Sequence, residues 1–468
     1  MNKYAIPFLI FFFLMHPDDS LFAQSAMINI SGRKAVSLNG EWKVIPDPRG
    51  VGDWWKVFKE KKPATKTDFV EYSFEGGPAF QVPGDFNTQM PELFYVEGVV
   101  WYKKNFHYTK KINKRIFIHF GAINYRADVY LNSKQIGTHE GGFTPFQFEL
   151  TNDIQEGENT IIVKVNSERL KDGIPAIDYD WFNYGGITRD VNLVTTSDTY
   201  IEDYFIQLKK HSSAEIVGWV KMNGNKTNQN IRIQIPELKL DYKTKADKDG
   251  LAELKVTSKV QLWSPENPKL YHVIIQAETD TIADEIGFRN IEVKGTKIFL
   301  NGKPVFFKGV SFHEERPQKG GRANSEADAR ILLGWAKELG CNLVRLAHYP
   351  HNEYTVKLAE KMGLMVWDEL PVYQQIEFSS PGMPDKLDLV LKEMIRRDRN
   401  RCGVVIWSLS NETFSFTPNR DFAMTELARK CRLLDSTRLI TTVITNKGYK
   451  NHTISVMDSL FRHYDFMS

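Results

Sequence analysis

The chain has 468 residues, of which 42% are hydrophobic and 25% are charged, and its formal net charge is +3. This composition is typical of a globular protein of two to four domains and excludes a disordered chain. Because the net charge is small and no basic run recurs on one face, nucleic acid and anionic membrane surfaces are not expected partners. Three widely spaced cysteines are expected to be buried thiols and not a disulfide framework: Cys341, Cys402 and Cys431.

The first 25 residues are predicted to be a signal peptide. Lys3 precedes the apolar run AIPFLIFFFLM (Ala5 to Met15), and small residues follow at 23–26. The run is too short to span a bilayer, and no cysteine follows it that could carry a lipid anchor. We therefore expect a periplasmic or secreted protein without a membrane anchor.

Two strand-rich blocks follow the signal peptide. In residues 27–197, runs such as KRIFIHFG, ADVYLNSKQIG and ENTIIVKVN alternate apolar and polar residues and are separated by Asn, Gly and Asp. This pattern predicts a β-sandwich of jelly-roll size. Residues 198–292 contain about seven more short strands, which is typical of an immunoglobulin-like β-sandwich.

From residue 293 to 468, short apolar runs alternate with helical patterns. VFFKGVSFHEE (Val305 to Glu315), NLVRLAHYP and LMVWDELP are each followed by a helical segment, which indicates βα units on a parallel sheet. The spacing suits a (β/α)8 TIM barrel. The last residues, DFMS, read as the opening of a sixth strand, so only the N-terminal part of a barrel is expected.

The stretch VVIWSLSNET (Val404 to Thr413) raises a question about chemistry. It ends a buried strand on Asn411 and Glu412, and a carboxylate at the mouth of such a strand is costly to desolvate unless it is needed there. Other strands end at His313, His348 and Asp368. In a βα barrel all these ends surround one pit. A lone histidine is more often structural, but the whole set favours a functional site.

At these residues the chain resembles glycoside hydrolase family 2, the β-glucuronidase and β-galactosidase family. The resemblance covers nearly all of the mature chain and rests on motifs in the family's order, among them WYKKNFHY, WFNYGGITRDV, LVRLAHYPHNEYTVKLAEKMGLMVWDELP and MIRRDRNRCGVVIWSLSNET. It departs at RNRCGVV, where the family usually shows Asn-His-Pro-Ser. That position is far from the pit, so the change bears on stability more than on chemistry.

The resemblance implies a retaining, exo-acting β-glycosidase, which needs two carboxyl groups about 5–5.5 Å apart. Glu412 matches the family's acid/base. Five residues match positions that contact the substrate: Asn411, His313, His348, Asp180 and Asp368. The family's nucleophile is a glutamate that ends the seventh strand. It is expected beyond Ser468, and the sequence is expected to be a fragment or a truncated gene product.

The resemblance defines the sugar of the substrate less narrowly than the reaction. WFNYGGI, with Asp180 just before it, resembles the β-glucuronidase branch; β-galactosidase is the alternative, and galacturonidases stay open. The implied partner is an oligosaccharide, polysaccharide or glycoconjugate, and a homo-oligomer is left open. A catalytically inactive carbohydrate-binding fragment is the competing class. No cofactor is expected, because no glycine-rich phosphate loop follows a strand. No metal is expected either, because His348 and His351 lack a third ligand nearby.

Overall fold

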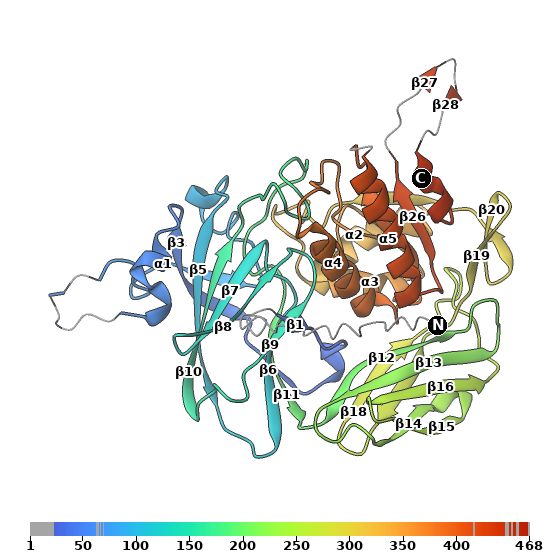
Figure 1. The fold of residues 1–468 in the computed structure, drawn as a ribbon, viewed down its shortest axis with the longest axis horizontal. Helices are drawn as coiled ribbons and strands as arrows, with labels where there is room; N and C mark the ends of the chain where they lie inside the picture. The colour runs from blue at the N-terminus through green and yellow to red at the C-terminus, as the bar shows by residue number, and fades with distance from the viewer. Residues whose placement is uncertain are drawn as a thin grey trace, which may run out of the picture.

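The computed structural model describes residues 23–466, except 62–64, 66, 69, 415–416, 445–448, 451–452 and 455–457. Figure 1 shows three units: a blue-green sandwich at the left, a green-yellow sandwich at the lower right and an orange-red α/β unit above it. Each unit has its own hydrophobic core. The predicted combination of jelly roll, immunoglobulin-like sandwich and TIM-barrel segment is confirmed.

The first unit is a sandwich of two antiparallel sheets. Its strands are β1 (Gln24–Ser25), β2 (Ala35–Ser37), β3 (Gly40–Asp47), β4 (Ala79–Val82), β5 (Val99–Tyr108), β6 (Lys114–Phe120), β7 (Arg126–Leu131), β8 (Lys134–Glu140), β9 (Phe146–Glu149), β10 (Gly157–Asn166) and β11 (Val191–Ser197), with the short helices α1 (Gly52–Trp55) and η4 (Pro91–Leu93) between strands. One sheet has the order β1-β9-β6-β11-β2 and the other β4-β3-β5-β10-β7-β8. Alternate apolar side chains of the two inner faces meet between the sheets, as in other sandwiches.

The second unit contains seven strands, as the sequence predicts. They are β12 (Tyr200–Leu208), β13 (Glu215–Asn223), β14 (Asn230–Ile235), β15 (Leu240–Lys245), β16 (Leu251–Thr257), β17 (Tyr271–Gln276) and β18 (Thr281–Ile286). β12, β13 and β16 form one sheet, and β15, β14, β17 and β18 form the other. The core between them is rich in isoleucine, a β-branched residue that suits a pleated surface.

A small antiparallel sheet leads into the third unit. It consists of β19 (Ile291–Lys294), β20 (Lys297–Leu300) and β21 (Lys303–Val305). The sequence treats Val305 to Glu315 as one apolar run, whereas in the structure β21 ends at Val305 and the next strand begins at Gly309. A Cβ atom on Gly309 would lie 2.9 Å from the Leu343 carbonyl oxygen, so a glycine lets the first barrel strand approach its neighbour closely.

The third unit alternates strands and helices. It contains β22 (Gly309–Phe312), α2 (Glu326–Glu338), β23 (Leu343–Leu346), α3 (Glu353–Lys361), β24 (Met365–Glu369), α4 (Met383–Asp398), β25 (Val404–Asn411), α5 (Pro418–Leu434) and β26 (Leu439–Val443). The five strands are parallel and lie in sequential order. Ser325, Asn352 and Thr417 cap their helices with side-chain hydrogen bonds. This is the βα pattern of a barrel.

The chain continues beside β26 after a short hairpin of β27 (Tyr449–Lys450) and β28 (Thr453–Ile454) and the 3-10 helix η6 (Ser459–His463). The Asp465 amide donates to the Ile440 carbonyl oxygen at 2.9 Å. The Thr441 hydroxyl donates to the Phe466 carbonyl oxygen at 2.9 Å. Residues 465 and 466 therefore run along the edge of the sheet, where a sixth strand is expected.

The RNRC segment joins the barrel unit to the immunoglobulin-like sandwich. The Asn400 side chain donates to the Tyr204 carbonyl oxygen at 2.9 Å and accepts from the Ile206 amide at 3.0 Å. The Arg289 guanidinium, which is fully buried, crosses in the opposite direction and donates to the carbonyl oxygens of Cys402, Val404 and Thr437. The departure from the family's text at RNRCGVV therefore lies in a domain junction at the base of the barrel.

All three cysteines are buried and free, as predicted. Among the described residues, no helix is long and apolar enough to cross a membrane.

Candidate active site

The C-terminal ends of four neighbouring strands bring polar side chains together. His313 follows β22, His348 follows β23, Glu369 ends β24, and Asn411 ends β25 with Glu412 next to it. Because the strands are parallel and adjacent, these positions share one edge of the sheet, and we call the place where they meet the pit. The structure thus brings His313, His348, Asn411 and Glu412 together, as the sequence predicts.

Arg345 organises the polar side chains of the pit. Its guanidinium forms a two-pronged pair with Glu369, with Nε 3.0 Å from Oε2 and Nη2 2.9 Å from Oε1. The same Nη2 donates to Asn411 Oδ1 at 2.7 Å. Since Oδ1 accepts from Arg345, the Nδ2 end of the Asn411 amide is the end available as a donor. Arg345 therefore fixes which way Asn411 points.

Glu369 is fully buried and binds three partners. Besides Arg345 it accepts from the Ser408 hydroxyl at 2.8 Å, and its Oε1 lies 2.7 Å from His348 Nδ1. The guanidinium, the hydroxyl and the imidazole together satisfy the hydrogen-bond acceptors of this buried carboxylate. Glu369 holds the pit in shape and is not free to react.

Glu412 lies at the mouth of the pit with a half-buried side chain. Gln374 Nε2 lies 3.4 Å from Glu412 Oε2. The backbone amide of Glu412 donates to the Val443 carbonyl oxygen at 2.9 Å. Its φ angle is +52°, a left-handed conformation that costs a non-glycine residue about 1–3 kcal/mol. Strain of this kind is concentrated at functional sites, so the conformation supports a functional role for Glu412.

A loop of the jelly roll completes the pit. Trp181 is only 5% exposed, and its ring centroid lies 5.7 Å from that of His313, 6.0 Å from that of His348 and 5.1 Å from that of Tyr373. Asp180, beside it, is exposed and lies near the Tyr373 hydroxyl: burial raises the pKa of Tyr373, and the Asp180 carboxylate raises it further. The predicted reach of Asp180 from the jelly roll to the pit is therefore found, and the pit belongs to two domains.

His313 is a neutral group in the pit. Burial lowers the pKa of His313 to about 4, with Arg322 lowering it further and the carboxylates of Asp180 and Glu369 acting in the opposite direction. Near neutral pH the His313 imidazole is therefore uncharged. It offers a hydrogen bond to a ligand and no positive charge.

The structure contradicts the predicted substrate contact of Asp368. Successive side chains of a strand point to opposite faces, so Glu369 faces the pit and Asp368 faces helix α4. The Asp368 carboxyl is fully buried beside Asp398 and Arg397. Burial raises its pKa well above the ordinary value, and the charge of Asp398 raises it further. The substrate-side carboxylate of β24 is Glu369, one residue further along.

Sequence reasoning also missed four other residues of the pit, namely Arg345, Trp181, Tyr373 and Gln374. Arg345 did carry a signal, because an arginine inside the apolar run LVRL must find a partner when it is buried. The other three carry none, since their roles depend on how the jelly-roll loop meets the barrel.

A buried ion-pair cluster lies next to His313 and joins the two domains. The Glu314 carboxylate, 1% exposed, lies 3.2 Å from Arg189 of the jelly roll and 3.4 Å from Arg322, and it accepts from the Asn352 amide. Burial alone would raise the pKa of Glu314, but the charges of Arg189 and Arg322 and the backbone amide of Asn352 together hold it below its ordinary value. Glu314 stays ionised and ties the jelly roll to the barrel.

His351, the other half of the H-x-x-H spacing, points into the protein. Its Nε2 lies 3.1 Å from the Ala347 carbonyl oxygen, and burial lowers its pKa to about 3. Within the described ranges, no three His, Cys, Asp or Glu side chains are grouped as metal ligands.

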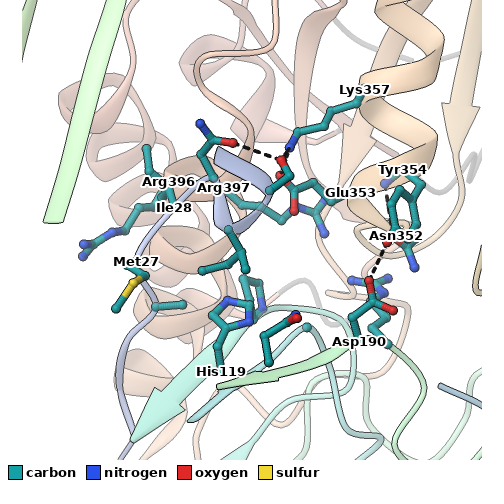
Figure 2. Close-up of a pocket in the computed structure, with 18 of the residues that line it drawn as sticks. Met27, Ile28, His119, Asp190, Asn352, Glu353, Tyr354, Lys357, Arg396 and Arg397 are labelled. Carbon is teal, nitrogen blue, oxygen red and sulfur yellow. Dashed lines mark hydrogen bonds and ion pairs between the residues drawn. The ribbon is translucent and has the colours of Figure 1, made fainter. Parts of the chain in front are cut away.

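A cavity of about 540 Å³ lies elsewhere, where the N-terminal segment meets β6, α3 and α4 (Figure 2). Its charged side chains are largely paired: Lys357 lies 2.6 Å from Glu353, and the Tyr354 hydroxyl donates to Asp190 at 2.5 Å. None of the strand-end residues of the pit lines it. The cavity is as large as a small-molecule site. Its charged side chains pair with one another across a domain junction and are not free to bind or react with a ligand, so the pit is the candidate site.

Comparison with known proteins agrees with the fold and the pit. Family models match three ranges: "Glycosyl hydrolases family 2, sugar binding domain" matches 35–197, "Glycosyl hydrolases family 2" matches 199–289, and "Glycosyl hydrolases family 2, TIM barrel domain" matches 291–468. Together these ranges leave little of the chain unmatched.

Curated relatives and solved structures are similar over most of the chain. A "Putative beta-glucuronidase" of Formosa agariphila is 31% identical over 330 residues, 67% of this chain and 40% of that protein. A "Beta-glucuronidase" of Rattus norvegicus is 29% identical over 423 residues, 80% of this chain and 64% of that protein. A "Beta-galactosidase" of Thermoanaerobacter pseudethanolicus is 31% identical over 431 residues, 85% of this chain and 54% of that protein. The chain thus spans 40% to 64% of the length of these relatives.

Two solved structures have the same arrangement of domains. An "Uncultured Clostridium sp. Beta-glucuronidase" matches with a TM-score of 0.78 at 28% identity, covering 91% of this chain and 75% of that one. The β-glucuronidase of Ruminococcus gnavus in complex with D-glucaro-d-lactam matches with a TM-score of 0.80 at 25% identity, covering 95% of this chain and 78% of that one.

Proposed function

We propose that this chain, which belongs to family 2 of the glycoside hydrolases, supplies the acid/base, Glu412, of a retaining, exo-acting β-glucuronidase. The observation that carries the proposal is the pit itself. Glu412 stands at its mouth, Arg345 aims the Asn411 amide, and the jelly roll contributes Asp180 and Trp181. Carboxyl and amide groups beside an aromatic ring suit a terminal sugar.

In the proposed reaction Glu412 protonates the oxygen of the leaving group and then removes a proton from the attacking water. The Asn411 Nδ2 donates to the sugar 2-hydroxyl, a hydrogen bond that strengthens in the transition state. His313, which is neutral, and the Asp180 carboxylate bind other hydroxyls of the sugar. The carboxylate that attacks the anomeric carbon is not assigned to a described residue.

The names of the relatives support glucuronate as the sugar, since both the curated proteins and the solved structures include β-glucuronidases. β-Galactosidase is the second candidate, because a protein with that name is 31% identical over 431 residues. The test compares kcat/KM for 4-nitrophenyl β-D-glucuronide and β-D-galactoside in a protein that carries this chain and a complete barrel. We expect the glucuronide to be preferred. Equal or faster turnover of the galactoside would reverse the order of the two candidates.

Export completes the proposal. The basic residue and apolar run at the N-terminus support removal of a signal peptide and a periplasmic or extracellular site of action.

If the 468-residue chain acts by itself, the proposal is narrower: it binds sugar through Asp180, His313 and Asn411 without cleaving it. Absence of turnover together with saturable sugar binding would support that narrower function.

A further inference from the structure

A second hollow on the jelly roll adjoins the pit. It measures about 420 Å³, and we call it the aromatic groove because Phe94, Tyr95 and Phe182 form its wall. The ring centroids of Phe94 and Tyr95 are 4.7 Å apart, and those of Phe94 and Phe182 are 5.1 Å apart. Tyr95 is 86% exposed and Phe94 40% exposed. Exposed rings gathered in one place mark a binding surface more often than single exposed rings do.

The aromatic groove and the pit share a wall. Asp180 and Trp181 line the groove, while Trp181 also contacts His313 and His348, and Asp180 lies near Tyr373 in the pit. A ligand that fills the pit therefore ends within reach of the groove. In an exo-acting enzyme the pit holds the terminal sugar, so any part of the substrate outside the pit belongs to the leaving group.

The loop that carries the exposed rings is held in place. The Asn87 amide donates to the carbonyl oxygens of Leu93, Phe94 and Val96, and η4 shapes the chain just before Phe94. Asn87 Oδ1 accepts from the Gly185 amide, which ties this loop to the one that carries Phe182. The backbone that carries the rings is thus held in place before a ligand arrives, which lowers the entropic cost of binding.

The polar side chains of the groove are already used. Arg169 pairs with Glu97 at 2.8 Å, donates to two carbonyl oxygens and stacks over the Tyr179 ring, and the Asn183 amide is bonded at both ends. What the groove offers is ring surface, with the carboxylates of Glu97 and Asp180 at its sides. Such a surface suits a flat apolar group without negative charge.

We propose that the aromatic groove binds the leaving group of the substrate, and that this leaving group is a flat, apolar, uncharged one such as an aryl aglycone. The inference rests on the proposed function, because that function places the terminal sugar in the pit. It assigns the groove as a second subsite, built wholly from the jelly roll, that selects the partner of the sugar.

The test measures binding to the 468-residue chain by isothermal titration calorimetry, so it needs no turnover. We expect 2-naphthyl β-D-glucuronide to bind more tightly than methyl β-D-glucuronide. Tyr95→Ala should weaken binding of the naphthyl compound about 2- to 12-fold, which corresponds to 0.5–1.5 kcal/mol for an aromatic pair, and leave the methyl compound unchanged. Tyr95→Phe should keep the affinity of the native chain. Phe422→Ala is the matched control, because that ring is 70% exposed on α5 outside the groove.

Three results would overturn the groove as a leaving-group subsite. They are equal affinity for the two glucuronides, no effect of Tyr95→Ala on the naphthyl compound, and equal losses in Tyr95→Ala and Phe422→Ala. A naphthyl compound with a sulfonate on its second ring should bind more weakly, and tighter binding of it would refute the charge argument. If neither glucuronide binds but the matching pair of galactosides shows the Tyr95 effect, the choice of sugar fails and the groove stands.

Discussion

Replacing Arg189 by methionine tests the junction between the jelly roll and the barrel. Arg189→Met keeps much of the side-chain volume and removes the guanidinium that lies 3.2 Å from the buried Glu314 carboxylate. Breaking a buried ion pair costs about 3–5 kcal/mol, because the remaining charge loses its compensation. Since Arg322 and the Asn352 amide still face Glu314, we expect the lower end, about 3 kcal/mol.

The loss should depend on pH in a defined direction. In the native protein the pKa of Glu314 lies below its ordinary value of 4.5, so its contribution is present above that value and is lost as the pH falls through the lowered pKa. Without Arg189 burial dominates, and the pKa should rise. The variant then carries a cost at neutral pH that is relieved as the carboxyl takes up a proton. The difference in stability between the two proteins should shrink between pH 7 and pH 4.

Urea unfolding followed by tryptophan fluorescence measures the difference. With a slope of about 2 kcal/mol per molar urea, a loss of about 3 kcal/mol moves the midpoint down by about 1.5 M. Hydrogen exchange of residues 309–346 should show the added opening. Arg232→Met, at an exposed pair with Asp241, is the control and should not move the midpoint. The reasoning fails if both variants behave alike, or if the effects of Arg189→Met and Glu314→Gln simply add, because coupled partners must not.

Three further outcomes are expected. In a protein with a complete barrel, Glu412→Gln should lose about 100- to 10,000-fold in kcat on substrates with poor leaving groups and much less on activated aryl glycosides. Added azide should restore turnover and give a β-glycosyl azide as the product. Full activity on poor leaving groups would contradict the acid/base role. Asp368→Asn should stabilise the protein more at pH 7 than at pH 4, each time relative to the native chain. The pKa of Asp368 is raised in the folded protein, so the native chain loses stability as the pH rises through that pKa, and the neutral Asn does not. Urea midpoints of both proteins at both pH values check this, and a difference that does not depend on pH speaks against it. N-terminal sequencing of exported protein should begin between Gln24 and Met27, and an intact Met1 in the cytoplasm would refute export.

Most of the fold could be predicted from the periodicity of apolar residues along the sequence. Alternation of apolar and polar residues marks the strands of both sandwiches, and the four polar strand ends mark the pit. These signals are local, so a single sequence contains them. The family motifs then predict roles for Glu412 and Asn411 from their positions. The edges of elements were less accurate: the run Val305 to Glu315 divides in the structure between β21 and β22.

What the sequence could not supply depends on which face a residue takes and on contacts between domains. Asp368 and Glu369 are adjacent acids at the end of one strand, and a shift of one residue exchanges the face toward the pit for the face toward α4. Trp181 and Tyr373 come from different domains, and only the docking of the jelly-roll loop brings their rings within 5.1 Å. No pattern within either segment encodes that meeting.

The Arg289 contacts at the base of the barrel affect how this protein can be divided into separate domains. The carbonyl oxygens of Cys402, Val404 and Thr437 lie at the beginning of β25 and just before β26, and their donor comes from the preceding domain. A stand-alone barrel that starts near residue 293 would lose these three hydrogen bonds from a charged donor, and each such bond contributes about 1.5–3 kcal/mol. For protein engineering, the smallest separable barrel unit therefore begins upstream of Arg289, within the range 198–292 that the sequence pattern assigns to the immunoglobulin-like sandwich.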